Sequence, residues 1–276
     1  MYHGKIGNNF EPMEEKMNYL EEYYNHFDEE GRLLSRHGQV EYLTTMRYIE
    51  ECLKGISTPN ILEVGAGTGR YSVTLAKQGR QVTAVELIEH NLEVLKSKLE
   101  GTEPITAFQG NALDLSRLSD NSFDLTMLLG PMYHLFTKEE KLKALSEAVR
   151  VTKPGGYILV AYCMNEPTIL QYVFGLNHVH EVMELNMLTP DWHCISDPKE
   201  LFEMVRTEEI EDLDSTVPVK RIKLVATDGA AHYMRECIDA MDDETFDQWM
   251  EYHFTICERQ DLIGASNHTL DILQKA

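Results

Sequence analysis

The sequence is poor in basic residues. Its 276 residues include 25 Lys and Arg against 46 Asp and Glu, which gives a formal net charge of −21. Nucleic-acid affinity depends largely on Lys and Arg contacts to phosphate, so a polyanionic partner would meet long-range repulsion. No cluster of Lys and Arg stands out along the chain. The composition therefore disfavours a nucleic-acid partner and favours a small-molecule one.

Paired cysteines are also absent. The five cysteines are scattered, odd in number, and form no C-x-x-C pair; they are Cys52, Cys163, Cys194, Cys237 and Cys257. This pattern argues against a disulfide framework and against a zinc site. We expect reduced thiols and predict no metal site.

Long hydrophobic runs are missing as well. The longest, such as 157–164, are far shorter than the roughly 20 residues that span a bilayer. The first ten residues contain no apolar stretch that resembles a signal peptide. We therefore expect a cytoplasmic protein without a membrane partner.

From residue 60 onward, short apolar segments alternate with helical ones, which is typical of βαβ units. The expected strands are 60–64, 81–86, 105–109, 123–129 and 156–162, and the expected helices are 70–78, 90–99 and 138–151. Pro154-Gly155-Gly156 is expected to form the turn into the fifth strand. The pattern predicts an α/β fold with a parallel, doubly wound sheet.

The flanks are less regular. Helical spacing is visible over 11–27 and 38–54, before the first strand. After residue 162 the alternation fails, and the later elements are predicted to be a strand at 219–227, a long helical region at 230–260 and a last strand at 268–273.

Glycines crowd the segment directly after the first expected strand. Ile61-Leu62-Glu63-Val64 leads into Gly65-Ala66-Gly67-Thr68-Gly69. Glycines there allow tight backbone angles and close approach of a ligand, and the helix that follows points its amino end at that ligand. Glu86 ends the next strand, 21 residues after Gly65, where a carboxylate can accept hydrogen bonds from both ribose hydroxyls of an adenosine ligand. The alternatives are a merely structural turn and a solvated carboxylate.

The glycine spacing separates two nucleotide-binding folds. A dinucleotide site has G-x-G-x-x-G, whereas here Gly69 comes one residue early and Arg70 takes the expected place. With Glu63 inside the strand, the segment resembles the class I S-adenosylmethionine-dependent methyltransferases, whose first motif reads E/D-x-G-x-G-x-G. The resemblance covers about residues 60–162 and implies a mostly parallel, seven-stranded, Rossmann-like sheet. A nicotinamide-dependent dehydrogenase is the less favoured alternative.

The resemblance implies S-adenosyl-L-methionine as cofactor. Its methionine portion would be lined by Gly65, Ala66, Gly67 and Gly69. Glu63 would act near the methionine ammonium group or brace the loop. Glu86 would bind the ribose, and Leu87 would lie beside the adenine.

Two further segments complete the implied cofactor site. Asn111-Ala112 follows the third strand, where the family often has Asp-Ala. The Asn111 amide would bind the adenine amino group, or Asn111 is an ordinary turn residue. Leu129 and Gly130, at the end of the fourth strand, would bring the backbone close to the cofactor.

Tyr133 and His134 are the candidate catalytic residues, because in this family the loop after the fourth strand lies next to the sulfonium methyl group. An acceptor hydroxyl, ammonium or thiol must lose a proton, and His134 has a suitable intrinsic pKa to accept it. The alternative is that His134 orients the loop through hydrogen bonds. Tyr133 is expected to shape the pocket rather than transfer protons.

The resemblance also implies a division of the chain. Residues 1–58 would form helices that cover the cofactor site, 59–162 the cofactor-binding core, 163–206 a lid that binds the acceptor, and 207–276 the completion of the sheet. An aromatic acceptor pocket is predicted from Tyr172, Phe174, Trp192 and His193, or these residues are simple core. By family geometry, Tyr19, Tyr23 or Tyr24 would cover the cofactor and Arg32 or Arg36 would meet its carboxylate.

The loop after the fourth strand reads Gly-Pro-Met-Tyr. It lacks the D/N/S-P-P-Y/F of amino-methylating DNA enzymes and the Pro-Cys of cytosine-C5 enzymes, and no spacing of carboxylates suggests a catechol-type magnesium site. We therefore expect a methyltransferase that moves the methyl group to N, O or S of a small molecule by in-line displacement. The alternatives are an RNA or protein methyltransferase on the same fold and a non-catalytic S-adenosylmethionine-binding protein.

Overall fold

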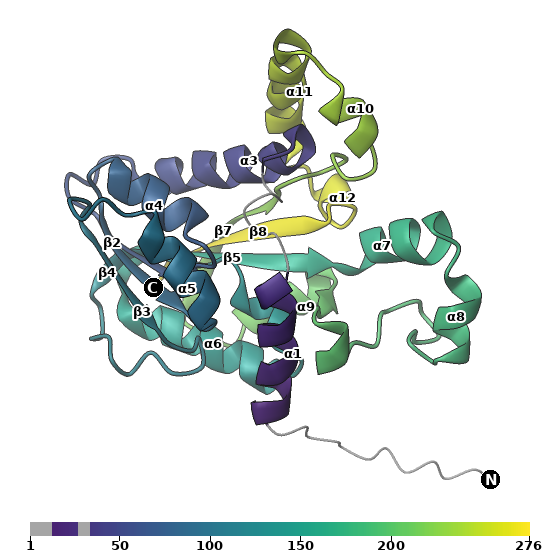
Figure 1. Ribbon diagram of the computed structural model, residues 1–276, viewed down its shortest axis with the longest axis horizontal. Coiled ribbons are helices and arrows are strands. Elements are labelled where there is room, and N and C mark those ends of the chain that lie inside the picture. The colour runs from purple at the N-terminus through teal and green to yellow at the C-terminus, as the bar shows by residue number, and fades with distance from the viewer. Residues whose placement is uncertain (1–12, 27–33) are drawn as a thin grey trace.

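A computed structural model describes residues 13–26 and 34–276, and of residues 13–18 and 26 only the backbone (Figure 1). Its centre is one sheet with the strand order β3-β2-β1-β4-β5-β8-β7. The strands are β1 Asn60–Val64, β2 Gln81–Glu86, β3 Ile105–Gln109, β4 Phe123–Leu128, β5 Thr152–Met164, β7 Val219–Ala226 and β8 His268–Lys275. An eighth strand, β6 (Met204–Val205), has two residues and pairs with β5.

The first five strands of this order run parallel, and β8 is antiparallel to both of its neighbours. The seven-stranded, mostly parallel sheet predicted from the sequence is thus confirmed, with the short β6 added. Because β1 is paired with β2 on one side and β4 on the other, the chain reverses its direction of winding at β1. In open α/β sheets, ligands bind at the carboxyl ends of the strands beside such a reversal.

Helices cover both faces of the sheet. One face packs against α3 (Arg36–Leu53), α4 (Arg70–Lys77) and α5 (Glu89–Ser97), and the other against α6 (Lys138–Val151) and α9 (Thr207–Asp214). Neighbouring strand residues alternate between the two cores: Ile61 faces α3 and α4, whereas Leu62 faces α6. Burial on both faces explains why the central strands read as continuous apolar runs.

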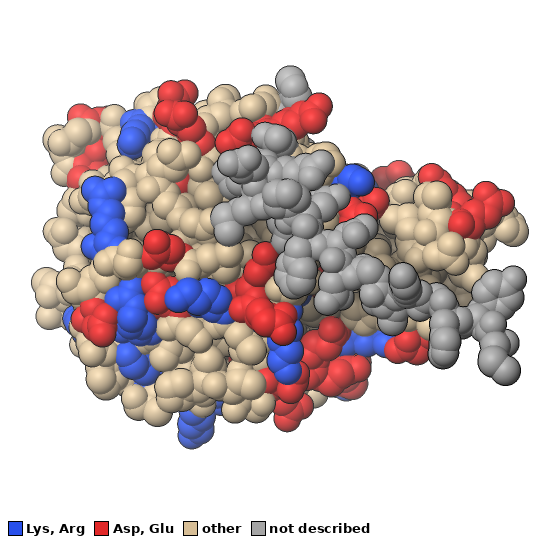
Figure 2. All heavy atoms as spheres, turned by 90° about the horizontal axis from the view of Figure 1, so that it is seen from below, with Lys and Arg blue, Asp and Glu red and all other residues tan. Residues whose placement is uncertain are grey.

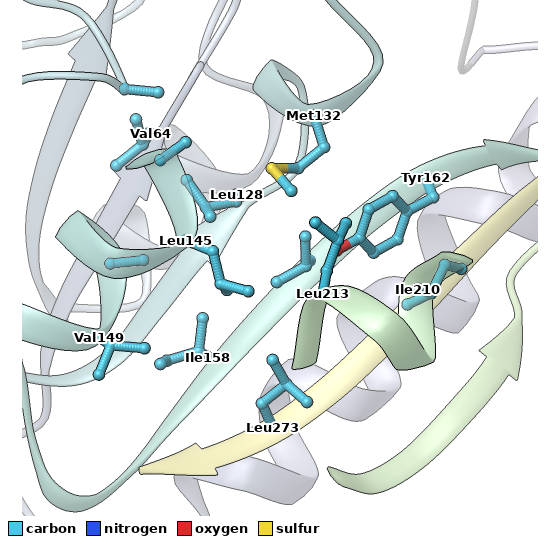
Figure 3. Packing of buried hydrophobic residues seen from close by; sticks show 14 of the residues in the cluster. Val64, Leu128, Met132, Leu145, Val149, Ile158, Tyr162, Ile210, Leu213 and Leu273 are labelled. Atoms are coloured by element: carbon cyan, nitrogen blue, oxygen red, sulfur yellow. The ribbon is translucent and has the colours of Figure 1, made fainter. Parts of the chain in front are cut away.

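The α6 side holds the larger of the two cores, shown close up in Figure 3. Leu145 and Val149 of α6 and Leu213 of α9 pack there against Ile158 and Leu273 of the sheet. Thr137 starts α6 with a capping box, in which its hydroxyl accepts from the Glu140 N–H and the Glu140 carboxylate accepts from the Thr137 N–H. This packing fixes α6 under the loop that follows β4.

Two predicted elements are corrected. The predicted helix over 230–260 is two helices, α10 (Arg235–Asp239) and α11 (Asp243–Ile256), because Asp242 caps a new helix through the Thr245 N–H. A short α12 (Gln260–Ile263) follows. The fifth strand starts at Thr152 rather than Gly156, since the Pro-Gly-Gly segment is accommodated as an irregularity in its pairing with β4.

The flanking elements surround one edge of the sheet. The helix α1 (Met13–His26) contacts α5 and the 3₁₀ helix η3 (Pro198–Glu200). After β5 the chain forms α7 (Asn165–Thr168), η2 (Ile169–Gly175) and α8 (Val179–Glu184), which extend away from the sheet (Figure 1). No helix in the described ranges has both the length and the apolar character to cross a bilayer.

Candidate functional site

A pocket of about 1440 Å³, its open mouth included, lies at the carboxyl ends of β1, β2, β3 and β4. The loops after all four strands contribute to its wall. Twelve of the thirteen residues predicted from the sequence line it: Glu63, Gly65, Ala66, Gly67, Glu86, Leu87, Asn111, Ala112, Leu129, Gly130, Tyr133 and His134. The structure therefore brings together residues that are up to 71 positions apart in the sequence.

Gly69 is the predicted residue outside the pocket wall. It caps α4 with φ +85°, and a Cβ there would lie 2.6 Å from Leu95 of α5. Glycine is required at this position by the left-handed backbone and by helix packing. Its place in the motif is therefore explained by the folding of the loop, and its contact with the cofactor stays a prediction.

The glycine loop itself has its amides engaged by the protein. Gly65 and Ala66 donate to the Val85 carbonyl of β2, and Gly67 donates to the Glu86 carboxylate over 2.7 Å. A Cβ on Gly65 would lie 2.7 Å from Pro131, and one on Gly130 would lie 3.2 Å from the Gly65 carbonyl. Because these glycines have no side chain, the loops after β1 and β4 can pack against each other at the wall of the pocket.

Glu86 is almost fully buried at the end of β2. Its two oxygens accept from the Gly67 and Ile88 amides, at 2.7 and 2.9 Å. Burial raises the pKa of this carboxyl, and the amide hydrogen bonds oppose that rise. The Asn91 side chain and the Leu87 backbone also hydrogen-bond to this carboxylate, so four groups of the protein hold it in the pocket wall.

Glu63 is buried in β1. It accepts from the Ser72 N–H at 2.9 Å and from the Ser72 hydroxyl, and so ties β1 to the first turns of α4. Burial raises the pKa of the Glu63 carboxyl to about 8, against the lowering effect of the two hydrogen bonds. These contacts correspond to the bracing role that the sequence left open.

Asn111 forms a local turn. Its side-chain oxygen accepts from the Leu113 N–H at 2.9 Å, as in an Asx-turn, which favours the turn interpretation over a dedicated ligand contact. Ala112 beside it is buried, and the Leu87 carbonyl on the neighbouring loop accepts from the Gln109 side chain. This wall of the pocket is therefore mostly apolar surface and backbone.

His134 uses both ring nitrogens within the protein. Nδ1 lies 2.7 Å from the Leu201 carbonyl oxygen, which can only accept, so Nδ1 carries the hydrogen. Nε2 then accepts from the Tyr24 hydroxyl at 2.9 Å. Burial lowers the pKa of the imidazole to about 4. A neutral imidazole with a hydrogen bond at each nitrogen is suited to orienting the loop rather than to accepting a proton at neutral pH.

Aromatic rings join α1 to this loop. Tyr24 and Tyr133 both contact the His134 ring edge-on, and Phe202 lies within 6 Å of both Tyr133 and His134. The Tyr133 hydroxyl donates to the Leu129 carbonyl. The described part of α1 thus contributes Tyr24, together with Leu20, to the pocket wall.

Arg70 is a site residue that the sequence interpretation passed over. It lines the pocket at the start of α4, its guanidinium stacks over Tyr42 at 4.6 Å, and its buried Nε–H has no hydrogen-bond partner among the described residues. Arg36, one of the two arginines expected near a cofactor carboxylate, instead pairs with Asp243 on α11 at 2.6 Å. Arg32, the other, lies outside the described residues. The signal for Arg70 was its position directly after the glycine motif.

The residues predicted for an aromatic acceptor pocket are not gathered in one place. Tyr172 lines a second cavity, formed by β5 and the segment 163–204, and stacks on His178. Phe174 and Trp192 form an exposed pair, and His193 is bound to Glu209. The second cavity is lined instead by residues such as Cys163, Met164 and Phe202.

Comparison with known proteins agrees with this arrangement. Residues 62–160 match the family described as a methyltransferase domain. These residues form a methyltransferase domain. The resemblance drawn from the glycine motif, to the class I S-adenosylmethionine-dependent methyltransferases, is thereby confirmed. The methyltransferase domain runs from β1 into β5 and contains all thirteen predicted site residues, of which twelve line the pocket.

Two curated relatives illustrate the extent of the similarity. A demethylmenaquinone methyltransferase of Clavibacter sepedonicus is 34% identical over 42% of this chain and 45% of its own length. A ubiquinone biosynthesis O-methyltransferase of Alkalilimnicola ehrlichii is 25% identical over 59% of this chain and 65% of its own length. The alignments therefore cover between about half and two thirds of these relatives.

Among solved structures, a Thermotoga maritima protein described as an S-adenosylmethionine-dependent methyltransferase, possibly a histamine N-methyltransferase, has a TM-score of 0.55. The alignment covers 94% of this chain and 99% of that protein, at 19% identity. The fold is thus shared over nearly the whole chain, including the elements outside the methyltransferase domain.

Proposed function

We propose that this chain is an S-adenosylmethionine-dependent methyltransferase that moves a methyl group to an N, O or S atom of a small molecule. The observation that carries the proposal is the meeting of four loops in one pocket: the glycine loop after β1, Glu86 at the end of β2, the Asn111 turn after β3, and the Gly130 loop after β4. The names of the curated relatives, both small-molecule methyltransferases, support the same class.

The residues of the pocket fit an adenosyl amino acid. Glu86 presents a carboxylate in the pocket wall that can accept from ribose hydroxyls, and the apolar wall of Leu87 and Ala112 suits a flat base. Arg70 lines the pocket directly after the glycine loop, its Nε–H has no partner among the described residues, and a guanidinium can donate to a carboxylate. We therefore assign Arg70 to the carboxylate of the cofactor, in the role that the sequence had given to Arg32 or Arg36.

When bound, S-adenosylmethionine supplies an electrophilic methyl group on its sulfonium. The protein must hold an acceptor atom in line with that methyl group and exclude water. Tyr133 and His134, in the loop after β4, form one wall of the pocket. The hydrogen bond between Tyr24 and His134 attaches α1 to this wall. We propose that His134 is a positioning residue and that Tyr133 shapes the acceptor side of the pocket.

The second cavity, beside β5 and the segment 163–206, is the proposed acceptor side. It shares His268 with the cofactor pocket, so the two spaces adjoin at the start of β8. Its wall is mixed, with the apolar Met164 and Leu188 beside polar groups such as Gln171. This mixture fits an acceptor with a hydrophobic body and a polar reacting group.

A small acceptor also agrees with the charge of the chain. On the face shown in Figure 2, Lys and Arg side chains lie among Asp and Glu side chains and form no continuous basic surface. With a net charge of −21, the protein would repel a polyanion. These observations weigh against the RNA methyltransferase alternative.

The test is calorimetry with S-adenosylhomocysteine, followed by turnover with a panel of small phenols, amines and thiols. Binding at a ratio of one per chain, with methyl transfer to at least one acceptor class, is the expected result. Binding without turnover across the panel would favour the non-catalytic alternative, and binding of a nicotinamide dinucleotide instead would refute the cofactor assignment.

A further inference from the structure

Two histidines and a carboxylate meet at the sheet edge where β7 ends and β8 begins. Asp228 lies just beyond β7, and His268 is the first residue of β8. The two strands pair with Ala226 opposite Thr269, which places Asp228 and His268 side by side. His232 follows Asp228 by four residues and turns back onto it. His268 also pairs with Cys163 of β5, so the cluster lies at the same edge as the cofactor pocket.

The donor atoms of this cluster converge. His268 Nδ1 lies 2.7 Å from Asp228 Oδ2, and His232 Nε2 lies 3.5 Å from the same oxygen. One donor atom from each of the three residues lies within 4.8 Å of the others. Glu41 of α3 brings a second carboxylate, with Oε2 3.5 Å from His268 Nδ1. Four possible ligands from three separate elements thus face one point.

Asp228 is held in position by its other oxygen. The residue is fully buried, and the Ser266 hydroxyl lies 2.5 Å from Oδ1, which also accepts from the His268 N–H at 3.2 Å. The Ser266 hydroxyl accepts in turn from the Gly229 N–H. Outer hydrogen bonds of this kind orient a carboxylate and turn its remaining oxygen toward a metal.

From these contacts we propose that Asp228, His232 and His268 form a binding site for a first-row divalent metal such as Zn²⁺, with Glu41 as a further ligand. Donor atoms at roughly 2.0–2.2 Å from a tetrahedral cation lie about 3.5 Å apart, as His232 and Asp228 do here and as His268 and Glu41 do. The 2.7 Å hydrogen bond between His268 and Asp228 would lengthen when a cation replaces its proton. Imidazole nitrogens favour such cations over Mg²⁺ and Ca²⁺, which prefer oxygen ligands alone.

The cation would face both cavities. His268 lines the cofactor pocket and the second cavity, Glu41 lines the first, and His232 lines the second. With Asp228, His232 and His268 as ligands, a tetrahedral cation has a fourth coordination position, which either Glu41 or an acceptor that displaces Glu41 would take. The proposal that this site binds a metal does not depend on methyl transfer. The use of the metal in the reaction rests on the proposed function. An acceptor hydroxyl bound to the cation would lose its proton more readily, whereas His134 is not suited to remove that proton.

The test begins with chelator-treated protein and Co²⁺, whose visible absorption reports bound imidazole and carboxylate ligands. We expect saturation at one Co²⁺ per chain, displacement by Zn²⁺, and weaker competition by Mg²⁺. The variants Asp228→Asn and His232→Gln should each weaken binding at least about tenfold. His178→Gln removes a surface histidine paired with Glu181 and should bind as the unaltered protein does.

His232→Gln keeps the test decisive if the fully buried Asp228 cannot be replaced without loss of folding, because the His232 side chain is only partly buried. Co²⁺ binding that is equally strong in the unaltered protein and in His232→Gln would overturn the proposal, as would a site that prefers Mg²⁺ to Zn²⁺. In that case the cluster is an internal hydrogen-bonded pair.

Calorimetry with S-adenosylhomocysteine on the same samples separates the two proposals. Neither Asp228 nor His232 lines the cofactor pocket, so both variants should retain cofactor binding. Loss of metal binding alone supports the metal site. An unaltered protein that binds metal but no S-adenosylhomocysteine would refute the proposed function and leave the metal site standing.

Discussion

The Gly67 amide donates a hydrogen bond of 2.7 Å to Glu86 Oε2, so the glycine loop after β1 is tied to the carboxylate that ends β2. The other carboxylate oxygen accepts from the Ile88 amide and fixes the start of the β2 loop. Glu86 therefore has two tasks, one in shaping the pocket and one, by our proposal, in binding the ribose. A substitution at this position tests both.

Replacing Glu86 by alanine should weaken the binding of S-adenosylhomocysteine by about 1–3 kcal/mol, the range for hydrogen bonds to a charged group. Isothermal calorimetry measures this change. Glu93→Ala is the matched control, because it removes an exposed carboxylate on the neighbouring helix α5 and should leave the affinity unaltered. Equal affinity of Glu86→Ala and the control would remove Glu86 from the ribose site.

Arg70→Met should weaken S-adenosylhomocysteine binding by about 1.5–3 kcal/mol, because Arg70 lines the pocket and its Nε–H has no partner among the described residues. Methylthioadenosine, which lacks the amino-acid carboxylate, should bind the variant and the unaltered protein equally well. Calorimetry with both ligands gives the comparison.

Arg36→Met serves as the control for Arg70. Arg36 pairs with Asp243 and lies outside the pocket wall, so its removal should not change either affinity. If Arg70→Met weakened both ligands to the same degree, the guanidinium would support the loop rather than bind a carboxylate.

The sheet and the glycine pocket could be predicted from the sequence because their signals are local. Strand, turn and helix follow each other within residues 60–78, and the apolar runs of the buried strands are contiguous. The predicted helix at 230–260 is interrupted because Asp242 caps a new helix. A prediction from hydrophobic periodicity alone does not take such a capping residue into account. Caps of this kind compete with a continuous helical pattern.

Contacts between distant segments could not be predicted. His134 has an ordinary intrinsic pKa, and only the fold shows that Leu201 and Tyr24 occupy its two nitrogens. The cluster of Asp228 and His268 spans 40 positions, and it depends on the antiparallel pairing of β7 with β8. No spacing rule along the chain reports such a juxtaposition, which explains why no metal site was predicted.

His134 should contribute no step to the pH dependence of turnover at neutral pH. With its pKa lowered to about 4 by burial, the imidazole is neutral above about pH 5. His134→Asn should reduce kcat by about 5- to 30-fold, the effect of one or two lost hydrogen bonds, without changing the shape of the pH profile between 5.5 and 8.5. Tyr24→Phe, which removes the hydroxyl bonded to Nε2, should give a similar but smaller decrease. An inflection near pH 6.5 that disappears in His134→Asn would restore the role of general base.

The stability of the folded chain should depend on pH through Glu63. Its folded-state pKa of about 8 lies above the value of about 4.3 in an unfolded chain, so between these values the folded state holds a proton that the unfolded state has lost. The contribution is complete below about pH 4.3 and is lost as the pH rises to about 8, with a slope of at most about 1.4 kcal/mol per pH unit.

Glu63→Gln removes this titration. Urea unfolding at pH 5.5, 6.5, 7.5 and 8.5 should show that the free energy of unfolding of the unaltered protein, relative to Glu63→Gln, falls as the pH rises. The exposed Glu93→Gln should show no such trend. A difference between the unaltered protein and Glu63→Gln that stays constant over this range would mean that Glu63 is ionised in the folded state throughout.

A comparison of Gly69 with Gly79 distinguishes two reasons why a position requires glycine: a left-handed backbone and a lack of space for a Cβ atom. Both have a left-handed backbone, with φ +85° and +83°, but a Cβ at Gly69 would lie 2.6 Å from Leu95, whereas a Cβ at Gly79 would meet no atom within 4 Å. Gly79→Ala should cost about 1 kcal/mol of stability from the backbone alone. Gly69→Ala should cost about 1–3 kcal/mol more, because the added methyl group overpacks the contact of α4 with α5. In a Leu95→Ala background, which opens that space, the cost of Gly69→Ala measured by urea unfolding should fall but stay above the Gly79 value, because Val73 Cγ2 would still lie 2.9 Å from the added Cβ. If the cost of Gly69→Ala were the same with and without Leu95, the contact with α5 would not be the reason for this glycine.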